Sequence, residues 1–227
     1  MDIIDKILIW SHVAAGILSL VTGLIAAIFA RKGGKLHRQV GKTYFWSMFW
    51  IFVSAILIVC FVRFNFFLTI IAVFSFYLTF NGYRVLTLKK TMQAAPIDWI
   101  ASIIAITFGA SLLVYGIIIL IQSNEALAYL SIIFGFFTTR TGFINFKGFR
   151  KIDQQEKMWW WFAHMGSMCG SLIAAFTAFL VQNGRIFNVP ESFGWALWLL
   201  PAIVGSPLIF YWVNKYKKQF KLGKYSV

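Results

Sequence analysis

The 227-residue chain is 60% hydrophobic and only 12% charged, and it contains 25 Phe and 10 Trp. Soluble domains are about half apolar and about a quarter charged, so a soluble fold of this length could not bury so much apolar surface, and the bilayer is expected to be its solvent. A net charge of +14 would suggest nucleic acid as the partner of a soluble protein. Here the basic residues fall in alternate connections between apolar runs, so topology explains the charge and no nucleic-acid binding is expected.

Seven apolar segments of membrane-spanning length follow one another along the chain. The first is too long for the apolar region of a signal peptide and lacks a small-x-small cleavage site before the next loop, so it is expected to be retained. We therefore predict one all-α integral membrane domain over residues 1–227, a bundle of seven transmembrane helices at about 7–30, 43–62, 66–88, 98–121, 126–146, 158–182 and 193–213.

The basic residues predict the orientation. Most of the 21 Lys and Arg residues lie in alternate connections on one side of the bundle, within 31–42, 84–90, 147–157 and 215–224. The other side carries Lys6, Arg63 and Arg185. The positive-inside rule then predicts an N-terminus outside and a cytoplasmic C-terminus, in a multi-pass protein of the cell's inner (cytoplasmic) membrane.

A first layer of polar residues lies toward the cytoplasmic side. At about 1.5 Å per helical residue, His164 is roughly 9 Å into its helix, and Arg84 and Arg140 lie at comparable depths. No Asp or Glu falls inside a span, and Asp98, at the start of the fourth helix, is the obvious internal counter-ion. The expected cofactor-binding set on this side is His37, Arg38, Tyr44, Asn81, Arg84, Arg140 and His164.

Several ligands would satisfy such a set. An Arg in low dielectric needs an anionic or carbonyl partner, such as a lipid phosphate, a haem propionate, a carboxylate solute or a quinone oxygen. Alternatively, Arg84 and Arg140 snorkel to headgroups and helix carbonyls. Haem b needs one or two imidazoles, so His164 or His37, or both as a pair, would ligate its iron. A quinone needs a His or Arg donor beside an aromatic wall, for which Tyr44 is one candidate.

A second polar site is centred on His12 in the outer half of the first helix. His12, Gly16, Ser19 and Gly23 follow the spacing i, i+4, i+7, i+11, which forms a stripe that lets helices approach closely. A His on such a face is more often hydrogen-bonded to a neighbouring helix than bound to a metal. The two cysteines, Cys60 and Cys169, lie inside apolar runs and are expected to be buried thiols without a disulfide.

The sequence argues against several chemistries. Three His residues and no acid within a span do not support metal-dependent hydrolysis, so haem iron is the one metal considered. A Ser-His-Asp arrangement lacks its acid, and the GxSxG, Rossmann and Walker patterns are absent. The last segment, 193–213, has no Lys for a retinal Schiff base. The sequence does not decide whether the protein is an enzyme.

Four segments carry a resemblance to a known family. WSHVAAGILSLVTGLIAA (10–27), HRQVGKTY (37–44), NGYR (81–84) and HMGSMCGSLIAAFTAFLV (164–181) resemble an uncharacterised bacterial family of predicted multi-pass membrane proteins with an HRxxGxxY motif. The resemblance covers most of the chain but implies no activity. It marks as signature residues His12, His37, Arg38, Gly41, Tyr44, Arg84 and His164. The HRxxG residues are also similar to those of succinate-dehydrogenase membrane anchors, which lie near a quinone site.

The leading hypothesis is a cytoplasmic-side His/Arg pocket that binds an anionic or quinoid cofactor, with haem b considered, for membrane electron transfer. A second hypothesis is a non-enzymatic transporter or a lipid- or solute-binding membrane protein that uses the same pocket. A third is an accessory subunit that docks a membrane-complex partner, or a second copy of itself, through the small-residue stripes.

Overall fold

The structure, a computed structural model, describes residues 3–62, 66–123, 125–184, 186–190 and 193–223, with the side chains of 66–68 left out. The described part is helical and contains seven helices long and apolar enough to cross a membrane, which confirms the predicted fold class. They are α1 (Ile3–Leu24), which a π-helical turn η1 (Ile25–Phe29) continues, α2 (Lys35–Phe61), α3 (Phe66–Thr91), α4 (Pro96–Gln122), α5 (Ala126–Phe149), α6 (Trp159–Gln182) and α7 (Ala196–Gln219), with a 3₁₀ turn η2 (Ile152–Gln154).

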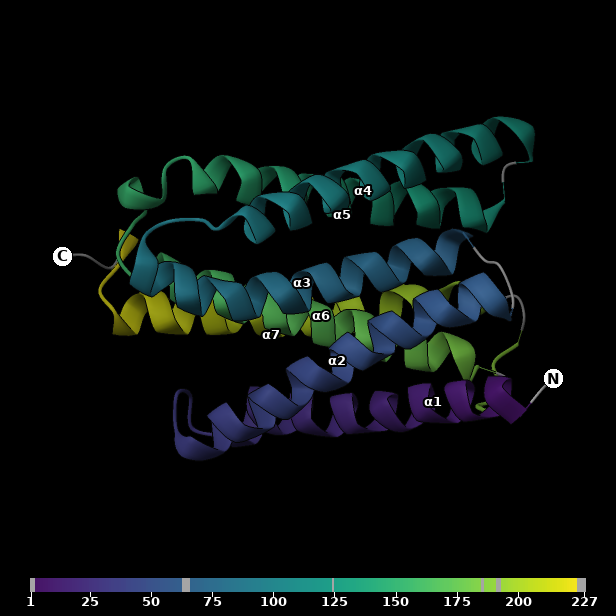
Figure 1. Cartoon of the computed structure of the whole chain (residues 1–227), viewed down its shortest axis with the longest axis horizontal. Coiled ribbons are helices and arrows are strands. Elements are labelled where there is room, and N and C mark those ends of the chain that lie inside the picture. Colours follow the sequence, from purple (N-terminus) through teal and green to yellow (C-terminus); the bar gives the residue numbers. More distant parts are fainter. Residues whose placement is uncertain (1–2, 63–65, 124, 185, 191–192, 224–227) are drawn as a thin grey trace.

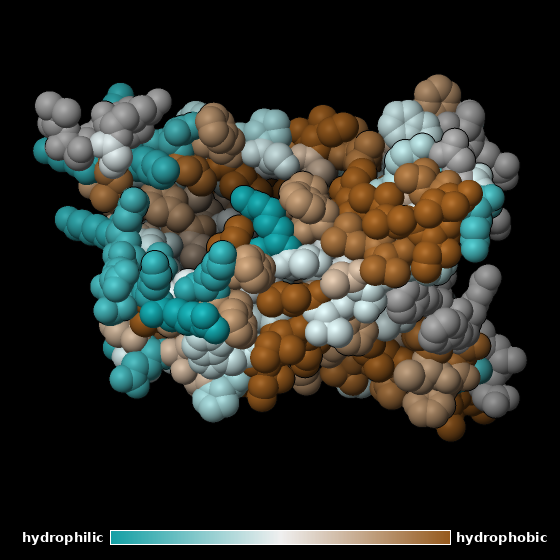
Figure 2. Space-filling view, turned by 90° about the horizontal axis from the view of Figure 1, so that it is seen from above, coloured by the Kyte–Doolittle hydropathy of each residue, from teal (hydrophilic) through white to brown (hydrophobic). Residues whose placement is uncertain are grey.

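Consecutive helices run in opposite directions, and the described chain starts and finishes at opposite ends of the bundle (Figure 1). The connections after α1, α3 and α5 share the left-hand end with the C-terminal end of α7. Figure 2 shows hydrophilic side chains gathered at that same end and hydrophobic ones over the opposite half. The predicted separation of charge between the two ends is therefore present in three dimensions. The expected residues Arg63, Arg185 and Lys224 lie outside the described residues.

The start of α2 corrects the sequence prediction. The stretch KLHRQVGKTY, expected to be a loop before a helix at about residue 43, forms the first turns of a helix that begins at Lys35. Hydropathy detects only the apolar part of a helix. The helix itself can extend beyond that part where the adjoining polar residues also favour helix formation. The extended backbone of Gly34 precedes this helix. His37 and Arg38 therefore lie on a helix and not in a loop.

The helices pack around α3, which contacts α2, α4, α5 and α6. One apolar cluster joins Ile70 and Ile71 of α3 with Leu112 and Leu130 of the α4–α5 hairpin. A second joins Tyr44 and Met48 of α2 with Leu172 of α6. By contrast, α7 has no buried residue and packs mainly against α6. Among the described residues, buried polar side chains lie on each of the helices α1 to α6, for example Ser19, Ser54, Thr79, Ser102, Ser131 and Ser171, and none lies on α7.

Candidate functional site

Two histidines from distant parts of the chain meet inside the bundle. The ring centres of His37 on α2 and His164 on α6 are 6.2 Å apart, with the rings at 73° to each other. His164 Nδ1 donates to the Gly82 carbonyl at 2.7 Å, and His37 Nδ1 donates to the Ala26 carbonyl at 3.2 Å. A carbonyl only accepts, so each Nδ1 carries a proton, and in its neutral form each ring keeps a lone pair on Nε2. This is the tautomer in which a histidine binds a metal or accepts a proton.

The π-helical end of α1 explains why His37 is held there. The last carbonyls of a helix have no partner within it, and here those of Ala26 and Ala27 accept hydrogen bonds from Lys32 Nζ at 2.7 and 2.6 Å. His37 shares the Ala26 carbonyl. A cation is favoured at this end of the helix dipole, and single π-turns occur frequently at functional sites.

Lys32 is a member of this site that the sequence analysis did not single out. Its Nζ lies 5.8 Å from the centre of the Trp212 ring, and its charge acts on both His37 and His164. Burial lowers the pKa of Lys32, because the ammonium is partly removed from water. In the sequence it resembled the other lysines that set topology. A Lys just beyond a helix end, able to cap its carbonyls, is the signal that could have found it.

Two further predicted residues lie on helices next to the histidine pair. Tyr44 is buried, and its hydroxyl is 2.7 Å from Ser171 Oγ. Since Ser171 donates to the Met168 carbonyl, Tyr44 is the donor in that contact. Asn81 Nδ2 donates to Ser167 Oγ at 2.9 Å. These hydrogen bonds link α2 and α3 to α6 and so position the helices around the histidines. They engage the Tyr44 hydroxyl and the Asn81 amide nitrogen within the protein.

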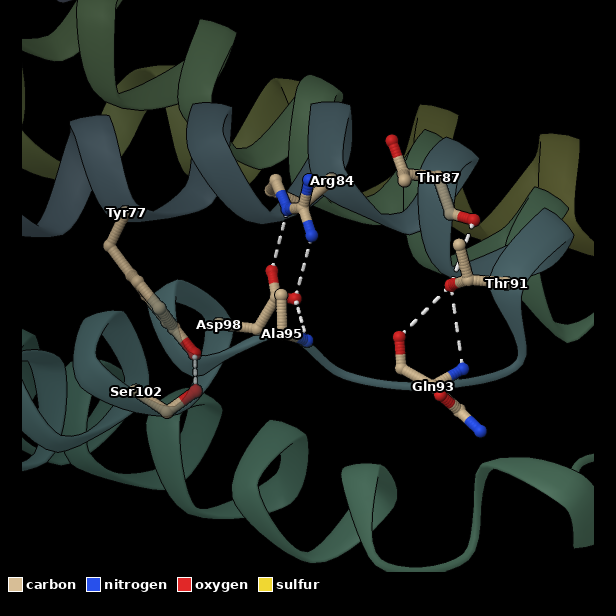
Figure 3. Close-up of polar contacts among 8 residues, drawn as sticks. All are labelled: Tyr77, Arg84, Thr87, Thr91, Gln93, Ala95, Asp98 and Ser102. Atoms are coloured by element: carbon tan, nitrogen blue, oxygen red, sulfur yellow. Dashed lines mark hydrogen bonds and ion pairs between the residues drawn. The ribbon is translucent and has the colours of Figure 1, made fainter.

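Arg84 is engaged elsewhere (Figure 3). Its Nε and Nη2 donate to the two carboxylate oxygens of Asp98 at 2.7 and 2.8 Å. Asp98 is 2% exposed and also accepts the Ala95 N–H, so it caps the start of α4 as well. The predicted counter-ion is confirmed. The pair links α3 to α4 and neutralises the Arg84 charge within the protein.

Arg38 and Arg140 are both exposed, and within the described part of the chain neither guanidinium makes a hydrogen bond or an ion pair. They are therefore not gathered with Arg84 into one cationic pocket. Their exposure leaves them open to headgroups, which was the alternative interpretation of the membrane arginines. Of the seven residues expected on this side, the structure brings His37 and His164 into contact and keeps Tyr44 and Asn81 nearby.

His12 lies in the other half of the bundle, apart from this pair. Its Nδ1 is 2.8 Å from Ser54 Oγ on α2. Ser54 donates to the Trp50 carbonyl at 2.6 Å, so His12 is the donor to Ser54. Farther along the small-residue stripe, a Cβ at Gly23 would lie 2.6 Å from Leu172, whereas one at Gly16 would meet nothing within 4 Å. His12 thus fits the expectation of a histidine hydrogen-bonded between helices.

Two apolar cavities stand out in the described part of the molecule, with volumes of about 340 and 190 Å³. The larger lies between the end of α1, α6 and α7, and the smaller between α2, α3 and α4. Neither is lined by His37 or His164. Cys169, a free thiol, lines the larger one. Among the described residues, no three His, Cys, Asp or Glu side chains form a metal-binding group.

No protein-family model, curated protein or solved structure matches the chain significantly.

Proposed function

We propose that this integral membrane protein is an electron-transfer component of the inner membrane, with its N-terminus outside and its C-terminus in the cytoplasm, and that His37 and His164 would hold the iron of a haem b. One observation carries the proposal: two imidazoles, each with Nδ1–H bound to a carbonyl, lie with ring centres 6.2 Å apart. Imidazoles on opposite faces of one metal have ring centres about 6 Å apart, since each metal–nitrogen bond is about 2 Å.

The chemistry of the donors fits haem. Two protein ligands are enough where a porphyrin supplies the other nitrogens, and a carbonyl at Nδ1–H fixes the ring and makes Nε2 more basic. Arg38, on the first turn of α2 and exposed, offers a cation for a propionate. When bound, haem b would supply one-electron chemistry. The chain would hold the iron between two helices and keep the surroundings apolar.

A macrocycle between the two rings would require movement of α2 relative to α6, because these helices pack together through Tyr44, Met48 and Leu172. Side-chain contacts, the histidine pair and the Tyr44–Ser171 bond, join α2 to α6, whereas the backbones of α1 and α3 approach α2 closely. Separating α2 from α6 would therefore cost few backbone contacts, but it would open the apolar cluster of Tyr44, Met48 and Leu172.

The proposed orientation in the membrane follows from the distribution of basic residues between the two ends of the bundle. The hydrophilic end of the bundle holds the α1–α2, α3–α4 and α5–α6 connections and the end of α7. Lys and Arg in short connections favour the cytoplasmic side. On this orientation the histidine pair lies in the cytoplasmic half of the membrane.

An absorption spectrum tests the haem proposal. Protein purified without added cofactor should show a Soret band that shifts on reduction with dithionite. His37→Leu and His164→Leu should each abolish or strongly weaken it, while His12→Leu, the matched control on α1, should retain it. A colourless wild-type protein from haem-replete cells would overturn the proposal.

A quinol is the second candidate for the same pair. The two Nε2 lone pairs are hydrogen-bond acceptors, and a quinol presents two O–H donors, whereas an oxidised quinone presents only acceptors. The protein should then bind a short-chain quinol more tightly than the matching quinone. His164→Leu should remove that preference and His12→Leu should not, and equal affinity for both redox forms in the wild type would argue against it.

A further inference from the structure

The larger cavity is an apolar groove, here called the α1–α7 groove, on the side of the bundle away from the α4–α5 hairpin. Its volume is about 340 Å³, near the small end of the range of about 300–1,000 Å³ for ligand sites. Its walls include Ala27, Ile28, Cys169, Leu172, Val204 and Trp212. Because α7 has no buried residue, the groove is bounded on one side by a helix that itself faces lipid. The shape and lining suit a hydrocarbon chain.

One end of the groove carries a positive charge. Lys32 Nζ is bonded to the Ala27 carbonyl and lies over the Trp212 ring, and both of these residues line the groove. An ammonium has three N–H donors, of which two are bound to the carbonyls of Ala26 and Ala27. One donor and the full charge remain for a ligand. Within the described residues, Lys32 forms no ion pair with a carboxylate.

We propose that the α1–α7 groove binds an anionic phospholipid, with one acyl chain along the groove and the phosphate at Lys32. A partly buried cation without a protein carboxylate is stabilised by an anion from the bilayer. The groove itself is not lined by His37 or His164, although Lys32 at its charged end is also a neighbour of this pair. The lipid proposal requires only that the protein lies in a membrane, as its seven long apolar helices indicate.

A phospholipid suits this site better than a free fatty acid. The groove has room for one chain, and a second chain can stay in the bilayer alongside α7. Trp212 at the charged end has the amphipathic ring that settles at headgroup level. In the proposed orientation, the basic end of the bundle also faces the leaflet rich in anionic phospholipid.

The experiment compares lipids on the full-length protein in detergent. Delipidated protein is titrated with phosphatidylglycerol, with phosphatidylcholine of identical chains and with oleate, and binding is followed by thermal stabilisation and native mass spectrometry. Phosphatidylglycerol should bind more tightly than phosphatidylcholine. Lys32→Gln should weaken its binding about fivefold, the effect of one lysine near an anionic surface, and leave phosphatidylcholine unchanged. Lys35→Gln, which alters an exposed lysine at the same end, should preserve the preference.

A groove-filling variant tests the acyl chain. Val204 lines the groove and is 57% exposed, so Val204→Trp adds bulk without entering the core. It should lose binding of both phospholipids, whereas Val114→Trp on α4, with 58% exposure, should not. If Val204→Trp does not fold, Ile28→Trp tests the same wall from α1. A lipid preference that survives Lys32→Gln would overturn the proposal, as would binding that survives groove filling, or oleate as tight as phosphatidylglycerol.

Discussion

His37 and His164 lie ring to ring between α2 and α6, and each donates Nδ1–H to a backbone carbonyl of a third helix. The Ala26 carbonyl belongs to the π-turn after α1, and the Gly82 carbonyl belongs to α3. Helices α1 and α3 thus orient two side chains that α2 and α6 carry. Because each Nδ1 is held by a backbone carbonyl, the Nε2 atom of each histidine remains available to bind a ligand.

Replacing one axial imidazole by a thioether should change the redox behaviour. If haem b is bound by this pair, His37→Met should raise its midpoint potential, on the order of 100 mV, because a Met/His pair favours reduced iron more than two imidazoles do. The measurement is a potentiometric titration followed at the Soret band. His12→Met is the matched control and should leave the potential unchanged. A similar shift in both variants would mean that His37 acts on the haem only indirectly, through the fold.

Asp98→Asn should destabilise the protein by about 3 kcal/mol, since removing one partner leaves the other charge in a partly buried site. Both carboxylate oxygens of Asp98 accept from Arg84, whose side chain is 21% exposed. Thermal unfolding in a fixed detergent measures the change. Arg84→Gln combined with Asp98→Asn should lose less than the two single variants together. Arg140→Gln, at an exposed arginine, should have little effect, and additive losses in the double variant would contradict the pairing.

Hydropathy alone was enough to predict the seven helices, because a span of this length in lipid must satisfy its own backbone. It did not predict that α2 begins at Lys35, since polar turns beyond the bilayer carry no hydropathy signal. Sequence reasoning also proposed Asp98 as a counter-ion and put His37 on the same side as His164. It could not tell which helices are neighbours, so it grouped Arg84 and Arg140 with the histidines.

Lys32 and the α1–α7 groove were missed for a related reason. A lysine after the first span is what the positive-inside rule requires, so its sequence context does not distinguish a topology signal from a ligand site. The groove is formed by residues at the end of α1 and on α6 and α7. Periodic patterns in the sequence do not show that these three helices are neighbours.

Gly109→Ala should separate the α4–α5 hairpin and destabilise the protein by about 1–3 kcal/mol. A Cβ there would lie 2.5 Å from Thr139 Oγ1 and 2.6 Å from the Thr139 backbone nitrogen, and the backbone cannot move aside cheaply. Gly166→Ala is the matched control, because nothing lies within 4 Å of its added Cβ. That variant should be neutral or should stabilise by up to about 1 kcal/mol, the difference in helix propensity. Equal melting temperatures for the two variants would contradict the close packing of α4 on α5.

Lipid preference should depend on pH through Lys32. Burial lowers the pKa of Lys32, and an anionic lipid binds the protonated form. The preference for phosphatidylglycerol over phosphatidylcholine should therefore be complete below this pKa and fall, by about fivefold, as the pH rises through it. The fall should come at lower pH than for an exposed lysine. Titrating lipid binding between about pH 7 and pH 10 measures it, because the phosphate keeps its charge over this range.

Lys32→Arg separates this effect from the other titratable groups that face Lys32, namely His37, His164 and Cys169. A guanidinium stays charged across the whole range, so this variant should hold its preference for phosphatidylglycerol where the wild type loses it. Cys169→Ser and the two His→Leu variants should titrate as the wild type does. If Lys32→Arg loses the preference at the same pH as the wild type, another group controls lipid binding, and Lys32 serves only to cap the carbonyls of Ala26 and Ala27.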